Sequence, residues 1–370
     1  MATEQLTYQP DYAIQPGATL RSTLAERGMT QADLAARTGL SLKHINQIVQ
    51  GNAPITHETA LLLEKTTGVP ARLWNALEAN YRDRLARRED KESLAGDAEW
   101  LDELPVKELV KRGHLNKDAD VGTRLQEVCR FFGVADRAAW ESVWREPLAS
   151  FRKSPAFKSD AGAVATWLRL GELEAERIEC KPFDARRFRA ALHEIRALTV
   201  TDPEQFVPRL VSLCAESGVA VVFVPEIPGT RASGAARWLT PTKALIQLSL
   251  RGKSDDRLWF SFFHEAAHLL LHGKKEVFIH AKREGPRVVE TPADIAEKEA
   301  DSFAATLLIP RQFDTELRQL RTVAEIQQFA QRLGIAPGIV VGRLQNDGIL
   351  KWNQCNKLKR RLTWADEKAG

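Results

Sequence analysis

The sequence predicts a mainly α-helical chain with one small β-sheet, an α+β fold class, and three observations support this prediction. Apolar side chains recur at helical spacing through most of residues 16–217. The period changes at GVAVVFVP (218–225), a β-branched run bounded by glycine and proline, which is typical of a strand. Helical spacing returns from Ser254 onward. The strands are therefore expected in one short stretch between two helical regions.

Each expected element after residue 217 has a local reason. The runs GAARWL and KALIQLSL flank a short loop at 240–242, which predicts a β-hairpin. Residues 254–256, SDD, offer oxygens that can cap a helix running to Leu271. A second helix is predicted at 292–308, just before a proline, and residues 322–346 are again helical.

Length and composition indicate an ordinary globular protein of two or three domains. The formal net charge of +4 is small for 370 residues and by itself implies neither nucleic-acid nor membrane binding. The four cysteines lie far apart without a CxxC pair, which argues against a thiolate metal site or a disulfide framework. Neither a signal-peptide pattern nor a run of about twenty apolar residues occurs, so we expect a cytoplasmic protein without membrane contact.

The run FSFFHEAAHLLLHG (260–273) suggests a metal site. His264 and His268 are four residues apart on a predicted helix, so both rings can point at one ion about 2 Å away, as zinc requires. Glu265 projects to the side and can take a proton from water that the metal activates. His272 lies two turns from His264, too far to share the ion, and is expected to face the last carbonyls of the helix.

The third ligand is expected from AEKEADSFAATLLIP (296–310). Glu297 and Asp301 are four residues apart on this predicted helix. Glu297 could complete a His-His-Glu site with the fourth position open for water. Asp301 could accept the other ring N–H of a ligand histidine and fix its tautomer. Glu299 is a weaker candidate for the third ligand, and His280 in the intervening loop is a rival.

The alternative is a buried core helix that carries histidines by chance. An HExxH motif alone arises by chance often enough to be weak evidence. A buried helix with His, Glu and His but without metal would need hydrogen-bond partners for three polar groups. The second pair of acidic residues on the following helix therefore favours zinc.

The segment 234–310 resembles the ImmA/IrrE family of metallopeptidases. The runs that carry the resemblance are GAARWL, KALIQLSLRGKSDDRLWFSFFHEAAHLLLHG and EKEADSFAATLLIP. The chain has Ala267 where the family typically has glycine, and Asp301 where asparagine is frequent. The resemblance implies a gluzincin-like fold that binds Zn²⁺ and cleaves one or a few proteins, commonly a transcriptional repressor. It also implies two histidine ligands, a third ligand and a general base: His264, His268, Glu297 and Glu265.

The group that would stabilise the oxyanion stays open. Zinc peptidases often use a Tyr, His or Arg for this purpose. The three tyrosines lie at or before residue 81, far from the motif in sequence. The remaining candidates are His280, Arg231, Arg237 and Arg287.

A second motif, MTQADLAARTGLSLKHINQIVQG (29–51), predicts a helix-turn-helix. Thr30 and Ser41 can cap successive helices, and Gly39 allows the tight turn between them. The second helix is expected to bury Leu42, Ile45 and Ile48. The motif resembles the Cro/C1 (XRE) type of phage repressor, and its flanking helices are similar to those of HigA-type antidotes. The resemblance places helix 41–49 in the major groove of double-stranded DNA.

The expected DNA contacts are the outward polar residues of that helix. Asn and Gln can pair with adenine edges, and Lys with guanine or phosphate. The residues are Ser41, Lys43, His44, Asn46 and Gln47. An ordinary helical hairpin is the alternative, because residues 1–95 carry 11 basic and 11 acidic side chains, without the usual basic surplus.

Four regions follow from these motifs: a helix-turn-helix domain (1–95), a helical middle or linker region (96–200), the zinc metallopeptidase domain (201–320) and a helical extension with a basic tail (321–370). The favoured function is a DNA-binding transcriptional regulator whose zinc endopeptidase cleaves a specific partner, such as a repressor. The protein substrate could also be a toxin–antitoxin partner. The alternative function is an antitoxin-like autorepressor whose metallopeptidase-like domain binds or senses a partner without proteolysis. A purely structural zinc domain is the weakest reading. Binding as a homodimer to a palindromic operator is expected.

Overall fold

The computed structural model describes residues 14–151, 160–273, 278–281 and 292–364. The contacts divide the chain into two compact units, residues 1–98 with 120–126 and residues 99–119 with 127–370. Among the described helices, none is both long and apolar enough to cross a lipid bilayer.

The first unit is helical and has its own buried core. Its helices are α1 (Pro16–Glu26), α2 (Gln31–Thr38), α3 (Leu42–Val49), α4 (His57–Thr67) and α5 (Ala71–Leu94). Leu20, Leu34 and Trp74 are fully buried in a cluster to which every one of these helices contributes. Gly17 of α1 lies so close to α3 that a Cβ atom there would be 2.2 Å from the Ile48 carbonyl oxygen. The close approach of α1 therefore depends on glycine at this position.

Helices α2 and α3 form the predicted helix-turn-helix. Thr30 and Asp33 make a reciprocal capping box at the start of α2. Gly39 ends α2 with φ +75°, a left-handed conformation that favours glycine. The prediction that Leu42 is buried was wrong, because its side chain is 51% exposed. The buried part of α3 begins one turn later than expected, at Ile45, and it includes Val49 at the end of the helix.

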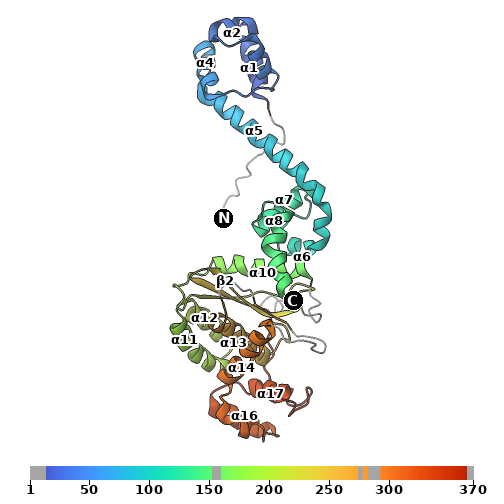
Figure 1. Cartoon of the computed structure of the whole chain (residues 1–370), viewed down its shortest axis with the longest axis vertical. Helices are drawn as coiled ribbons and strands as arrows, with labels where there is room; N and C mark the ends of the chain where they lie inside the picture. The colour runs from blue at the N-terminus through green and yellow to red at the C-terminus, as the bar shows by residue number, and fades with distance from the viewer. Residues whose placement is uncertain (1–13, 152–159, 274–277, 282–291, 365–370) are drawn as a thin grey trace. The chain divides into compact units, whose positions relative to one another are not determined.

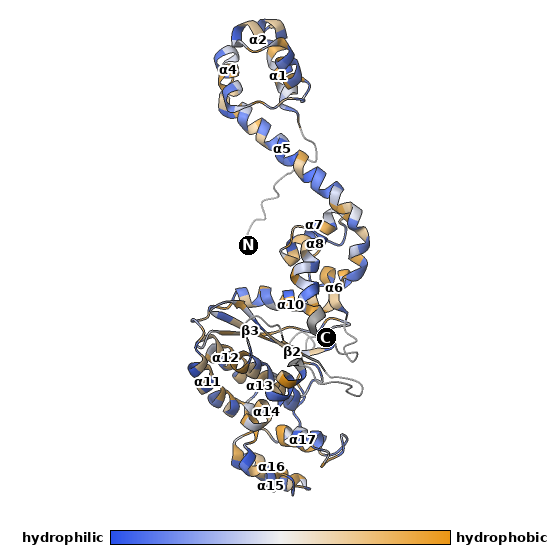
Figure 2. Ribbon diagram, viewed as in Figure 1, coloured by the Kyte–Doolittle hydropathy of each residue, from blue (hydrophilic) through white to orange (hydrophobic). Residues whose placement is uncertain are grey.

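Helix α5 is long and polar, and the hydropathy colouring shows it largely blue (Figure 2). Its surface carries ion pairs four residues apart, among them Arg82–Glu78 and Arg87–Asp83. Such exposed pairs contribute little to stability, because water screens the charges.

A helical region connects the first unit to the sheet. Its elements are η1 (Ala95–Glu103), α6 (Val106–Lys111), α7 (Val121–Phe132), α8 (Arg137–Trp140), η2 (Glu141–Arg145) and α9 (Glu146–Phe151). Phe132, Trp140 and Trp144 form a cluster of edge-to-face rings, with Phe132 5.8 Å from Trp140 and 5.6 Å from Trp144. The region predicted as helical between residues 96 and 200 is therefore helical and has an aromatic core.

The second unit contains a four-stranded mixed sheet. Its strands are β1 (Val219–Phe223), β2 (Ala232–Thr240), β3 (Lys243–Leu248) and β4 (Phe278–Ala281). The strand order is β1-β3-β2-β4, with β1 parallel to β3 and β2 antiparallel to both β3 and β4. The predicted hairpin is the β2–β3 pair.

Helices cover both faces of this sheet (Figure 1). Helix α10 (Ala161–Glu176) lies on one face, where the Gln247 amide donates to the Trp167 carbonyl at 2.6 Å. The other face carries α12 (Pro203–Ala215) and α13 (Asp255–Leu271). The remaining elements are α11 (Ala185–Ala197), η3 (Leu198–Val200), α14 (Pro292–Leu308), η4 (Arg311–Phe313), α15 (Asp314–Leu317), α16 (Val323–Leu333), α17 (Pro337–Asn346) and η5 (Asn356–Leu358).

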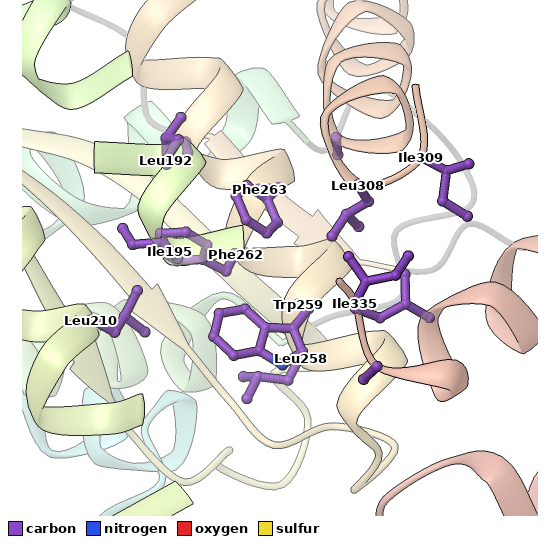
Figure 3. Packing of buried hydrophobic residues seen from close by; sticks show 14 of the residues in the cluster. Leu192, Ile195, Leu210, Leu258, Trp259, Phe262, Phe263, Leu308, Ile309 and Ile335 are labelled. Carbon is purple, nitrogen blue, oxygen red and sulfur yellow. The ribbon is translucent and has the colours of Figure 1, made fainter. Parts of the chain in front are cut away.

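Helix α13 lies at the centre of the second unit and is buried on nearly all sides. Trp259, Phe262 and Phe263 pack with Leu308 and Ile335 in the main core (Figure 3). The apolar face of α17 packs against α13, with Val340 and Val341 fully buried. The helical extension predicted from residue 321 onward therefore packs on this domain through α17. Burial on all sides explains why α13 reads as a nearly continuous apolar run.

The chain after α17 returns to the first turn of α13. The Asp255 N–H donates to the Arg360 carbonyl at 3.0 Å, and the Leu362 N–H donates to the Lys253 carbonyl at 3.0 Å. The Lys359 ammonium pairs with the Asp256 carboxylate at 2.7 Å. Residues 355–362, called the C-terminal clasp below, thus hold the start of α13.

Asp255→Asn is expected to stabilise the fold, and more at pH 8 than at pH 5. Asp255 is 3% exposed, and burial raises its pKa from 3.8 to about 6. The raised pKa means that the folded state favours the neutral acid. Ionisation of Asp255 therefore lowers the free energy of unfolding, and this loss is complete once the pH has risen above about 6. The stabilisation by Asn should be about 1 kcal/mol larger at pH 8 than at pH 5. Thermal unfolding at both pH values measures it, with the exposed Asp102→Asn as control. A gain that does not change with pH would contradict the expectation.

Candidate metal centre and helix-turn-helix

Helices α13 and α14 bring three candidate ligands together. His264 and His268 lie one turn apart on α13 with fully buried side chains, and their Nε2 atoms are 3.0 Å apart. Glu297 of α14 places one carboxylate oxygen 3.4 Å from His264 Nε2 and the other 3.4 Å from His268 Nε2. Within the described part of the chain, these three residues form the group of His, Cys, Asp or Glu side chains that could hold a metal ion.

This donor set fits zinc. Donors about 2.0–2.1 Å from a zinc ion at the corners of a tetrahedron lie about 3.3 Å from one another. The three spacings of 3.0, 3.4 and 3.4 Å match that value. Two imidazoles and one carboxylate are also ligand types that zinc binds. With three protein donors, one corner is left for water or substrate, which is the pattern of catalytic sites.

Asp301 lies where the sequence predicted an acceptor for a ligand ring. Its carboxylate is 2.9 Å from His264 Nδ1, while Nε2 of the same ring faces Glu297. Burial lowers the pKa of His264, but the hydrogen bonds to Asp301 and Glu297 outweigh this effect and raise it to about 10. Burial dominates at His268 and lowers its pKa to about 4. The carboxylates of Asp301 and Glu297 thus stabilise positive charge on the His264 ring.

His272 occupies a position that differs from the predicted one, whereas Glu299, the weaker ligand candidate, lies outside the group of three candidate ligands. Helix α13 ends at Leu271, and His272 has an extended backbone with φ −115°. Its ring does not face the last carbonyls, because Nδ1 lies 3.0 Å from His268 Nδ1 and Nε2 lies 3.1 Å from a Glu299 oxygen. Phe278 stacks on the His268 ring with centroids 4.0 Å apart. In the sequence, the contact between His268 and His272 was signalled only by their four-residue spacing.

Glu265 is fully buried against strand β2. A Cβ atom on Gly234 would lie 2.7 Å from Glu265 Oε1 and 2.8 Å from its Cγ. Gly234 lies in β2, where it pairs with His280 of β4. Glycine at this point therefore makes the room in which the Glu265 side chain lies.

Gly234→Ala is expected to displace Glu265 and to destabilise the domain. The added methyl group would overlap the buried Glu265 side chain, which typically costs about 1–3 kcal/mol. Thermal unfolding measures the loss. Gly273→Ala is the matched control, because a Cβ atom there meets nothing within 4 Å. Equal unfolding temperatures of the two variants would show that strand β2 can shift to accommodate the methyl group without loss of stability.

Two of the oxyanion candidates can be placed. Arg237 lies on the α10 side of the sheet, where its guanidinium donates to the Leu168 carbonyl at 2.8 Å and lies 5.4 Å from the Trp144 ring. It therefore points away from Glu265 and is removed from the candidates. Arg231 is exposed just before β2. Arg287 and the side chain of His280 lie outside the described residues, and the oxyanion group stays a prediction.

Helix α3 presents the predicted DNA-contacting residues in different ways. Lys43 and Asn46 are exposed, while His44 and Gln47 are half-buried. Ser41 is exposed, but its hydroxyl already accepts the His44 N–H at 3.1 Å as the helix cap. Lys43 and Asn46 are therefore the most accessible side chains of the predicted set.

Comparison with known families agrees with both motifs. Residues 214–345 match the model of a peptidase family described as the IrrE N-terminal-like domain. This segment is an IrrE-like domain. It contains the sheet, α13 and α14, and therefore all three candidate ligands. Residues 20–74 match the helix-turn-helix family model, so the chain joins a DNA-binding type of domain to the IrrE-like domain.

No curated protein matches the chain. Among solved structures, an addiction module antidote protein of a HigA (higA) family from Coxiella burnetii is similar to part of the chain. The two are 25% identical over 22% of this chain and 90% of the antidote, with a TM-score of 0.21.

Proposed function

We propose that the chain is a DNA-binding transcriptional regulator whose IrrE-like domain is a zinc-dependent endopeptidase that cleaves a specific protein partner, such as a repressor. The observation that supports this most is the buried triangle of His264, His268 and Glu297, with Glu265 next in the chain. The test compares new protein N-termini in cells that express the wild-type chain with those in cells that express Glu265→Gln.

In this proposal the two histidines and Glu297 would hold the metal, which supplies a Lewis acid that lowers the pKa of water and polarises the scissile carbonyl. Glu265 accepts a proton as the oxygen of water attacks the carbonyl carbon. The same carboxylic acid then gives that proton to the nitrogen as the C–N bond breaks. The products are a carboxylate and an amine.

The buried position of Glu265 beside Gly234 supports this role. Asp301 would hold the His264 ring through Nδ1, so that Nε2 keeps its lone pair for the ion.

Asn46→Ala is expected to weaken binding to a specific operator by about 10–100-fold, since a bidentate base contact is worth about 1–3 kcal/mol. Lys43→Ala should weaken binding to all DNA sequences and reduce its salt dependence. The operator is obtained by selection from random duplexes, and fluorescence anisotropy measures affinity. Lys65→Ala on α4 is the exposed control. Equal affinity of Asn46→Ala and wild type for the operator would show that Asn46 does not contact a base. Selected DNA sites without a palindrome would contradict binding as a homodimer.

A further inference from the structure

We propose that His272 and Glu299 form a hydrogen-bonded relay that positions His268 as a metal ligand, as Asp301 does for His264. The inference rests on the metal site of the proposed function. Sequence reasoning assigned His272 and Glu299 no part in holding a ligand ring. Both are positioning residues in this proposal, because they act through His268 and touch neither metal nor substrate.

The distances define a continuous chain of polar atoms. His268 Nδ1 lies 3.0 Å from His272 Nδ1, and His272 Nε2 lies 3.1 Å from a Glu299 oxygen. The other nitrogen of His268, Nε2, faces Glu297 at 3.4 Å. Both nitrogens of His268 and both nitrogens of His272 therefore face a polar group, one on each side of the ring.

One arrangement of protons leaves His268 Nε2 free to bind a cation. The proton of His268 must then be on Nδ1, which donates to His272 Nδ1. His272 in turn carries its proton on Nε2, which donates to the Glu299 carboxylate. The relay thus sets the tautomers of both rings, and it ends on a side chain that is 57% exposed.

The same contacts exclude His272 as a ligand. Its Nδ1 faces the side of the His268 ring that points away from the triangle, and its Nε2 faces Glu299. Phe278 packs against both rings, with centroids 4.0 Å from His268 and 5.2 Å from His272. Rotation of the His268 ring would therefore break its bond to His272 and its stack on Phe278 together.

The two ligand histidines are held differently. His264 reaches Asp301 directly at 2.9 Å, whereas His268 reaches a carboxylate only through a second imidazole. A group that orients a ligand histidine typically changes metal affinity by 10–100-fold when it is removed. Because His272 is neutral when it accepts from His268, its removal should cost less than removal of Asp301.

The test measures zinc affinity of the full chain by competition with a chromophoric chelator. His272→Phe keeps a ring against Phe278 but removes the acceptor, and should weaken zinc binding by about 10-fold or more. His272→Asn places its amide oxygen where Nδ1 lies, and should recover most of the loss. Glu299→Gln should weaken binding by a few-fold in the wild type and not further in His272→Asn, where the link is already broken. His193→Phe, an exposed histidine on α11, is the control.

The outcomes separate this inference from the proposed function. Zinc bound by the wild type and by His272→Phe with affinities within about twofold would overturn the relay and leave the metal site standing. An Asn variant as weak as the Phe variant would reduce the contact to packing and also overturn the relay. A wild-type chain that binds no supplied zinc would overturn both proposals. If His272→Phe does not fold, the effect of Glu299→Gln in the two backgrounds decides.

Discussion

Glu265→Gln is expected to abolish proteolysis while the chain keeps its metal. The amide has the size of the carboxylate and fits the same space beside Gly234, but it cannot accept a proton from water. General-base catalysis contributes typically 10²–10⁴-fold, so cleavage should fall by at least about 100-fold. Zinc content should not change, because Glu265 is not one of the three grouped donors.

The measurement is a comparison of labelled protein N-termini in cells that express wild type, Glu265→Gln or the control Glu179→Gln, an exposed glutamate. An N-terminus that appears with wild type and control but not with Glu265→Gln identifies the substrate and its cleaved bond. Equal cleavage by all three chains would refute the assignment of the base. Absence of any new N-terminus, with zinc bound, would favour the antitoxin-like alternative, in which the domain binds its partner without cutting it.

Glu297→Ala is expected to lose the metal. The wild-type chain should contain about one zinc, because three donors with one open corner form a complete catalytic-type site. Two histidines without the carboxylate are a poor site, and the zinc content of the variant should fall to about one tenth or less. Added zinc should also raise the unfolding temperature of the wild type but not of the variant, since a ligand stabilises only the state that binds it.

Elemental analysis after dialysis measures zinc per chain, and Glu297→Gln tests whether the charge or the volume of the side chain matters. Glu179→Ala is again the control. Full zinc in Glu297→Ala would mean that the third ligand is elsewhere, with His280 the next candidate. A wild type without zinc, even after zinc is supplied, would remove the peptidase proposal and leave a DNA-binding protein of the antidote kind.

The parts of the site that depend on local geometry were predictable from the sequence. The four-residue spacing of His264 and His268 places both rings on one face of any α-helix, whatever surrounds it. The same holds for Glu297 and Asp301, and the two helices do bring these pairs together. The helix-turn-helix was predictable for the same reason, because Thr30, Gly39 and Ser41 act within one turn of their own positions.

The errors lie where tertiary structure decides. Whether Arg237 faces Glu265 or α10 depends on the register of β2, and an arginine fits either face in the sequence. The burial of Leu42 depends on where the neighbouring helices end. His272 contacts Glu299 because α13 stops one residue before it and the backbone becomes extended. None of these facts is encoded in the spacing of nearby residues.

The C-terminal clasp has a consequence for the order in which the protein matures during synthesis. The helix-turn-helix needs only residues that leave the ribosome early, whereas the first turn of α13 is held by Arg360, Lys359 and Leu362. A nascent chain can therefore complete its DNA-binding domain while the helix that carries the histidines is still unsupported. The two histidines of the candidate metal site therefore gain the full support of their helix only after the clasp has been translated.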